Sequence, residues 1–414
     1  MRYRPAEQIA GNLLDRTFIL SPRGPAMNAH RSLAACIGLT WAAILAGWSE
    51  SYIPSSAALG AEVQQTRSAA IDALITGRFR WIGGAPVLAP LQRSDDYYYS
   101  VKDPSVVFFD GRWHVFCTIR GKNRSHQIEY ISFADWNDTG SATRAILKLS
   151  DGYFCAPQVF FFRPHKKWYM ILQVIDQTRQ PALQPAFATT EKLADPDCWS
   201  KPTLLYEQHP ENVKAWIDFW VICDEHKAHL FFTSLDGQMW RAETALGDFP
   251  RRWTKPQVVL RADIFEASHT YRLKWPSQPS APPEKQAVAK QSPAASSNRP
   301  NYLTIVEAQA SGGRRYYKAY VAERLEGPWQ PLADSLQKPF AAPTNVRLPE
   351  PPWTDSFSHG ELLRAGVDER LEIDPARLRF LYQGVSDKDR AGKAYGQIPW
   401  RLGLLELDAS GSDR

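Results

Sequence analysis

The chain has 414 residues and a formal net charge of +5, and aromatic residues make up 12% of it, including 15 tryptophans. So small a charge excess gives no reason to expect a nucleic-acid partner, and the length suits one large all-β domain after an N-terminal leader. A surplus of tryptophan and tyrosine suits sheet cores and stacking platforms for sugar rings.

Residues 1–61 are expected to form an N-terminal extension with a signal-like segment. The apolar run Leu33–Trp48 follows His30–Arg31, and small residues occupy Ser55–Ala61, as in a secretory signal. The run is short for a membrane span, so no stable membrane insertion is expected after processing, and the mature chain is expected to be secreted, periplasmic or on the cell surface. An uncleaved anchor is the alternative. A lipidation box ending at Cys36 lies at the start of the run, which disfavours lipidation.

The cysteines beyond the leader have no spacing typical of a metal site, so zinc is not expected. Three of the four lie in apolar, strand-like runs and are expected to be small buried thiols, although pairing of some of them in an exported chain stays open. The four are Cys117, Cys155, Cys198 and Cys223.

A polar, mildly helical lead-in over 62–78 is expected to precede a catalytic domain over 79–414. The stretch Ser100–Cys117 predicts the innermost strand of a β-propeller blade, because two apolar runs flank an Asp110–Gly111 hairpin signal. Asp103 is expected at the mouth of this strand. Pro104 is expected to be tolerated there because the strand has hardly begun.

Four further units repeat this order of a polar entry, an apolar run, a turn and a second run. Entries recur about every 50 to 60 residues, longer where there are insertions, which predicts an all-β, five-bladed propeller built of four-stranded blades. A β-sandwich would explain the strands but not the recurrence of acids at equivalent positions. The four units begin near Gly152, Trp216, Ile264 and Ser358.

The composition shifts over 276–300 to Pro, Ala, Ser, Gln and Lys without apolar periodicity. Such a segment cannot support a packed core and is expected to be a disordered hairpin loop inserted into the fourth blade. Tyr302–Ala308 is expected to pair with Thr270–Leu273 across it, so one domain is favoured over two. Arg314–Arg315 is expected to be a solvated strand start or a rim contact.

Inner strands of a propeller run outward from the same end of the channel, so Asp103, Asp218, Glu266 and His359 are expected to converge. Inverting glycoside hydrolysis needs one carboxylic acid to protonate the leaving oxygen and one carboxylate to activate water on the opposite face of the sugar. A third carboxylate nearby favours the protonated form of the acid through like-charge repulsion. The three acids supply this set.

Six motifs in this order, KDPS, GYFCAPQVF, IDFWVICD, FEAS, SHGE and FLYQG, resemble glycoside hydrolase family 62, which shares a clan with family 43. The resemblance extends from about Phe79 to about Leu407. It implies a five-bladed propeller that releases arabinofuranose side chains from arabinoxylan or its oligosaccharides with inversion. By the same resemblance, Asp103 is the general base, Glu266 the general acid and Asp218 the residue that tunes the acid and orients the sugar.

The resemblance also implies a calcium ion in the central channel near His359, held largely through water, and no organic cofactor. Lys102 and Tyr382 match positions expected to line the arabinose pocket, and Gln158 is a further candidate. The segment Gln173–Thr189 follows no pattern that can be aligned with the family.

Two other functions remain open. One is a family 43-like arabinanase or xylosidase with the same three carboxylates, and the other is a non-catalytic sugar-binding propeller. No nucleophile elbow, phosphate-binding loop, zinc-protease helix or dinucleotide fingerprint is present in the sequence. Nothing in it indicates an obligate oligomer, so a monomer is expected.

Overall fold

The computed structural model describes residues 65, 69–276 and 299–408. The expected leader over 1–61 and nearly all of the 276–300 insertion lie outside the described residues. Within the described ranges, no helix has the length and apolar character needed to cross a membrane.

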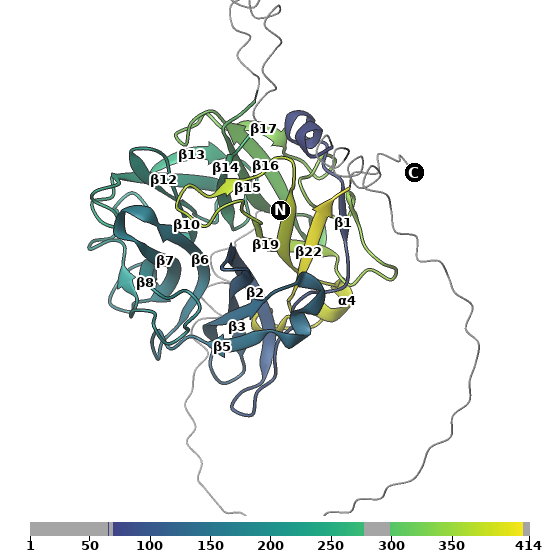
Figure 1. Cartoon of the computed structure of the whole chain (residues 1–414), viewed down its shortest axis with the longest axis horizontal. Coiled ribbons are helices and arrows are strands. Elements are labelled where there is room, and N and C mark those ends of the chain that lie inside the picture. The colour runs from purple at the N-terminus through teal and green to yellow at the C-terminus, as the bar shows by residue number, and fades with distance from the viewer. Residues whose placement is uncertain (1–64, 66–68, 277–298, 409–414) are drawn as a thin grey trace, which may run out of the picture. The chain divides into compact units, whose positions relative to one another are not determined.

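Five antiparallel-based sheets are arranged around one axis, with β2, β6, β10 and β19 toward the middle (Figure 1). The all-β, five-bladed propeller expected from the sequence is confirmed. Blade one contains β2 (Tyr98–Phe109), β3 (Arg112–Gly121), β4 (His126–Phe133) and β5 (Thr143–Ile146). Blade two contains β6 (Phe154–Phe162), β7 (Lys167–Ile175), β8 (Leu183–Thr190) and β9 (Thr203–Leu204). Blade three contains β10 (Ile217–Cys223), β11 (Lys227–Thr233), β12 (Gln238–Ala245) and β13 (Gln257–Arg261).

The last two blades each carry an additional strand. Blade four contains β14 (Ser268–Leu273), β15 (Tyr302–Gln309), β16 (Arg315–Ala322), β17 (Gln330–Ala333) and β20 (Glu372–Ile373). Blade five contains β19 (Ser356–Leu362), β21 (Arg379–Val385), β22 (Arg401–Leu407), β1 (Trp81–Gly83) and β18 (Val346–Arg347). The expected pairing of β14 with β15 across the insertion is confirmed.

The ring of blades is closed by the first strand of the domain. β1 pairs antiparallel with β22, near the end of the described chain, so blade five combines strands from both ends of the domain. This pairing covers an edge that would otherwise present free backbone groups. Short helical segments lie in the connections: residues 69–76, η1 (Trp136–Ser141), η2 (Arg163–His165), η3 (Ser311–Gly313), α4 (Asp387–Arg390) and η4 (Tyr395–Gln397).

The inner strands read as continuous apolar runs because neighbouring blades bury both of their faces. In β10, the residues Phe219–Cys223 are all apolar and buried. The hairpin from β2 to β3 turns at Asp110 and Gly111, whose φ values of 48° and 71° suit a tight two-residue turn. The expected Asp-Gly hairpin is therefore confirmed.

Asp103 does not lie at the mouth of its strand, contrary to the sequence-based expectation, but inside β2. The β2–β3 register shifts between Lys102 and Ser105, which marks a bulge. Pro104 is tolerated because it falls in this interruption of the hydrogen-bond ladder, and not because the strand has just begun.

The channel is closed at the carboxyl ends of the inner strands by the segment that follows β19. The backbone N–H groups of Phe161, Cys223 and Arg272 donate to carbonyl oxygens of Val367, Glu369 and Leu371, at 2.7, 2.8 and 3.3 Å, respectively. This segment therefore crosses blades two, three and four in turn. The candidate carboxylates belong to the other, amino-terminal part of the inner strands.

Candidate active site

The same backbone device positions two of the three carboxylates. Asp103 and Asp218 have positive φ values of 50° and 56°, and Ala156 occupies the equivalent bulge of blade two at 49°. Each bulge interrupts pairing with the second strand of its blade. Left-handed backbone at non-glycine residues costs of order 1–3 kcal/mol and persists only where surrounding structure holds it.

That surrounding structure is a side chain from the second strand of the preceding blade. The N–H of Asp103 donates to Oε1 of Gln383 at 2.8 Å, and the N–H of Asp218 donates to Oε1 of Gln173 at 3.0 Å. In blade two, the N–H of Ala156 donates to Oγ1 of Thr118 at 2.8 Å. The bulges in blades one and three direct the side chains of Asp103 and Asp218 into the channel. The equivalent residue of blade two is Ala156, whose side chain is only a methyl group.

His359 lies between the two aspartates. Its Nδ1 is 3.5 Å from Oδ1 of Asp103 and 3.7 Å from Oδ2 of Asp218. Burial lowers the pKa of His359 to about 3, and the positive charges of Lys102 and Arg315 act in the same direction. The imidazole is therefore neutral near pH 7 and brings no positive charge to the site.

Glu266 reaches the site from a segment just before β14. The backbone of Glu307 in β15 holds this segment on both sides: the N–H of Phe265 donates to its carbonyl oxygen at 2.7 Å, and its own N–H donates to the carbonyl of Ala267 at 2.9 Å. Nη1 of Arg315 lies 2.9 Å from Oε2 of Glu266, whose side chain is 14% exposed.

The charges of these groups act on one another across the channel. Burial raises the pKa of Asp218 well above its usual value, and the nearby charges of Glu266, Asp103 and Glu307 raise it further. Both effects favour the protonated form of Asp218. Burial lowers the pKa of Lys102, but the acidic groups around it, Asp103 foremost among them, together outweigh this effect and raise the pKa overall. Nζ of Lys102 lies 3.8 Å from Oδ2 of Asp103.

Five of the seven expected site residues lie together in the channel: Lys102, Asp103, Asp218, Glu266 and His359. The other two, Gln158 and Tyr382, are engaged in contacts elsewhere. Gln158 is 1% exposed, and its side chain amide exchanges two hydrogen bonds of 2.7 Å with the backbone of Val221, so it links blades two and three. Tyr382 is also 1% exposed, and its ring packs between Trp353 and Phe357 in the core. Neither side chain is free to bind a sugar.

Three further residues lie near the site that were not expected there from the sequence. Tyr395 in η4 is 40% exposed, and its ring centre lies 5.5 Å from Nζ of Lys102, so it forms part of the mouth. Arg315 is 6% exposed and is not the solvated residue expected, whereas its neighbour Arg314 is exposed and pairs with Asp387. Glu307 has no exposed side chain surface. The available signal for Arg315 in the sequence was the Arg314–Arg315 pair, of which Arg315 begins β16.

The cysteines play a structural part in the fold. Cys117, Cys155 and Cys223 are buried free thiols, as expected, while Cys198 is exposed and also free. No two of these four cysteines form a disulfide.

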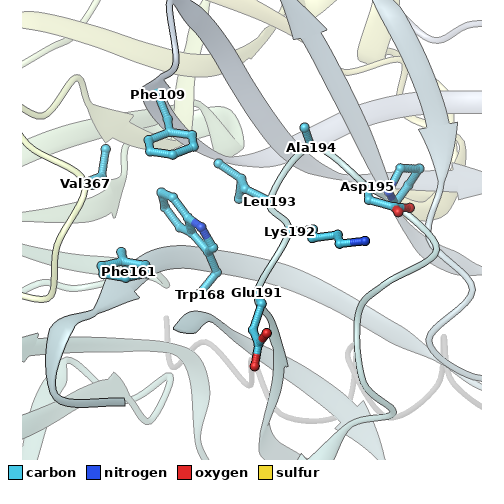
Figure 2. A pocket seen from close by; sticks show the side chains of 10 residues that line it. Phe109, Phe161, Trp168, Glu191, Lys192, Leu193, Ala194, Asp195 and Val367 are labelled. Atoms are coloured by element: carbon cyan, nitrogen blue, oxygen red, sulfur yellow. The ribbon is translucent and has the colours of Figure 1, made fainter. Parts of the chain in front are cut away.

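The structure also has an apolar cavity of about 820 Å³, whose lining side chains are shown in Figure 2. Phe109, Phe161 and Trp168 line it together with the connection from β8 to β9 and Val367. Phe109 is six residues beyond Asp103 in β2, about 20 Å along a strand. The cavity therefore belongs to the end of the propeller that the closing segment covers.

A five-bladed propeller that gathers three carboxylates in its channel has the architecture and the acidic site of a glycoside hydrolase. The family model for glycosyl hydrolase family 62 matches residues 87–406, and the chain belongs to this family. The family resemblance drawn from the six sequence motifs is thereby confirmed.

Known relatives agree with this assignment. Alpha-L-arabinofuranosidase C of Cellvibrio japonicus (strain Ueda107) is 34% identical over 336 residues, which are 79% of this chain and 47% of that protein. The chain thus spans about half the length of this curated relative.

Solved structures of the family superpose over most of the domain. The catalytic domain of the family 62 α-L-arabinofuranosidase of Coprinopsis cinerea matches with a TM-score of 0.70 and 34% identity, covering 81% of this chain and 99% of that chain. An α-L-arabinofuranosidase from Podospora anserina in complex with cellotriose matches with a TM-score of 0.67 and 32% identity, covering 80% and 98%. A family 62 hydrolase in complex with xylotriose matches with a TM-score of 0.69 and 30% identity, covering 80% and 98%.

Proposed function

We propose that this protein is an α-L-arabinofuranosidase that removes arabinofuranosyl side chains from arabinoxylan with inversion of configuration. The observation that carries the proposal is the convergence of Asp103 and Asp218 on one neutral histidine, with Glu266 held close enough for its charge to act on Asp218. The named activities of the relatives support the choice of sugar. The relative solved with xylotriose supports a xylan backbone.

In this mechanism Asp103 removes a proton from water as the water oxygen attacks the anomeric carbon of arabinose. The bond from that carbon to the xylose oxygen breaks, and Glu266 donates a proton to the leaving oxygen. Both carboxyl groups act in one displacement, so no covalent intermediate forms on the enzyme.

Asp218 has a different role in the proposal. A carboxyl group with a raised pKa can stay protonated and donate a hydrogen bond to a sugar hydroxyl. Lys102 would bind a hydroxyl beside Asp103, and Tyr395, exposed at the mouth, would contact the sugar or the xylan chain.

Calcium in the channel is part of the proposal. His359 lies between the side chain oxygens of Asp103 and Asp218, and oxygen ligands suit a hard cation that keeps most of its other ligands as water. His359 would contact the ion or its hydration shell. When bound, the ion would supply positive charge beside these side chains. We further propose that the protein acts outside the cytoplasm, on the basis of the leader-like sequence over 33–48 and the polymeric substrate. A monomer is proposed because nothing in the sequence indicates an obligate oligomer.

The proposal is tested by incubating the purified chain with arabinoxylan, linear arabinan and an aryl xyloside, and identifying the sugars released. Arabinose from arabinoxylan as the main product is the expected result. Arabino-oligosaccharides from arabinan, or xylose from the xyloside, as the main product would favour a family 43-like activity. Failure to release sugar from any of the three would favour a binding protein.

A further inference from the structure

Behind Glu266 lies a buried ion pair that the mechanism above does not use. Nη1 of Arg315 contacts Oε1 of Glu307 at 2.7 Å as well as Oε2 of Glu266 at 2.9 Å. Glu307 lies in β15 and Arg315 begins β16, on adjacent paired strands of blade four. The Arg315 side chain is 7% exposed and that of Glu307 is fully buried.

The guanidinium group is fixed in place from several directions. Its central carbon stands 3.9 Å from the centre of the Phe265 ring, which immediately precedes Glu266. Because the backbone of Glu307 also holds the segment around Glu266, one residue fixes both the backbone of the acid and the cation at its carboxyl group.

The pair continues into a chain of hydrogen bonds that reaches the general base. Oγ of Ser358 donates to Oε1 of Glu307 at 2.7 Å, and Nε2 of Gln383 donates to Oγ of Ser358 at 3.0 Å. Gln383 in turn accepts the N–H of Asp103 at 2.8 Å. Side chains from blades four and five thus connect the acid with the bulge that carries the base.

We propose that Arg315 and Glu307 are positioning residues for the general acid Glu266 and set the pH range in which it can donate its proton. The inference rests on the proposed function. Arg315 occupies Oε2 of Glu266, so the transferable proton belongs on Oε1, and the same contact stabilises the carboxylate that forms as the proton leaves.

Glu307 moderates this effect. It shares the charge of Arg315, so Glu266 is not exposed to a full unpaired cation that would favour its ionised form. The other charged or titratable groups facing Glu266 are Asp218 from β10, Lys102 from β2 and Tyr395 from η4.

The test compares two substrates that differ in their need for acid assistance. The leaving group of arabinoxylan is a sugar oxygen, which is a poor leaving group unless it is protonated. The leaving group of 4-nitrophenyl α-L-arabinofuranoside is nitrophenolate, which departs without protonation. Glu307→Gln and Arg315→Gln are each expected to reduce kcat on arabinoxylan by at least about tenfold, within the range attributed to general acid catalysis, and by less than about threefold on the nitrophenyl substrate.

The pH dependence of kcat/KM on arabinoxylan provides the second readout. With Glu307→Gln, the whole charge of Arg315 acts on Glu266, so the alkaline limb is expected to move to lower pH. With Arg315→Gln, the limb is expected to move to higher pH, because the stabilising cation is gone. Opposite shifts are not expected of two variants that merely loosen the fold.

Glu361→Gln is the matched control, because Glu361 and Arg364 form a fully buried pair at 2.7 Å in the same channel wall without contacting Glu266. Equal losses on both substrates, as expected for this control, or limbs that do not move, would overturn the inference. Glu266→Gln distinguishes the levels of failure. If Glu266→Gln loses as much activity on the nitrophenyl substrate as on arabinoxylan, the assignment of Glu266 as the general acid fails. If Glu266→Gln is the only variant that loses more activity on arabinoxylan than on the nitrophenyl substrate, the positioning role of Arg315 and Glu307 fails and the acid assignment stands.

Discussion

Gln173 and Asp218 exchange two hydrogen bonds between blades two and three: the Asp218 N–H donates to Oε1 of Gln173 at 3.0 Å, and Nε2 of Gln173 lies 3.4 Å from Oδ1 of Asp218. One side chain therefore holds both the left-handed backbone and the carboxyl group of a site residue. The position of Asp218 in blade three therefore depends on Gln173 of blade two.

Replacing Gln173 with Leu is expected to lower stability by about 1–3 kcal/mol, because a buried N–H loses its acceptor. It should also reduce kcat, by up to about 10²-fold if Asp218 moves by 1 Å. Gln158→Leu is the matched control, since Gln158 accepts the N–H of Val221 in the same wall without touching a carboxylate. Denaturant unfolding and steady-state kinetics separate the two effects. Equal kcat values for the two variants would contradict a positioning role for Gln173.

The raised pKa of Asp218 predicts a pH dependence of stability. Its usual value is 3.8, and the folded chain retains the proton above that pH while the unfolded chain releases it. The free energy of unfolding should therefore fall as pH rises from about 4, with a contribution of up to about 1.4 kcal/mol per pH unit. Asp218→Asn removes this contribution, so its unfolding free energy should decline less steeply between pH 4 and pH 7. Identical slopes for the two proteins would rule out a buried, protonated Asp218.

Removal of calcium is expected to lower the thermal unfolding midpoint of the wild-type protein, because an ion that binds only the folded state stabilises it. Added calcium should restore the midpoint after treatment with a chelator. His359→Gln should reduce the response to both treatments. A wild-type midpoint that is the same with and without chelator would argue against a channel ion.

Asp103→Asn and Glu266→Gln are each expected to reduce turnover of arabinoxylan by about 10²–10⁴-fold, the usual contribution of general base or acid catalysis. Both substitutions keep the size of the side chain, so the circular dichroism spectrum and unfolding midpoint should change little. Near-normal turnover in either variant would remove that residue from its role.

Much of the fold could be predicted from the sequence because the inner strands are buried on both faces and therefore appear as apolar runs between turns. Asp103, Asp218, Glu266 and His359 stood out since each precedes or opens such a run. Their local geometry did not follow, because a bulge is a property of strand pairing, and the pairing partners of β2 and β10 determine it.

Other residues were misjudged for a related reason. Tyr382 alternates along β21 with residues near the channel, but its own side chain faces the core. The side chain of Gln158 hydrogen-bonds to the backbone of the next blade. Arg315 reads as a surface charge until the fold places two carboxylates beside it. Contacts between blades depend on residues distant in sequence, and no local pattern encodes them.

The most direct measurement of the central claim is the anomeric form of arabinose first released from arabinoxylan, followed by proton NMR before mutarotation. A single displacement by water activated at Asp103 predicts that the β-anomer appears first from the α-linked side chains. Initial appearance of the α-anomer would mean retention through two displacements and would contradict the roles given to Asp103 and Glu266.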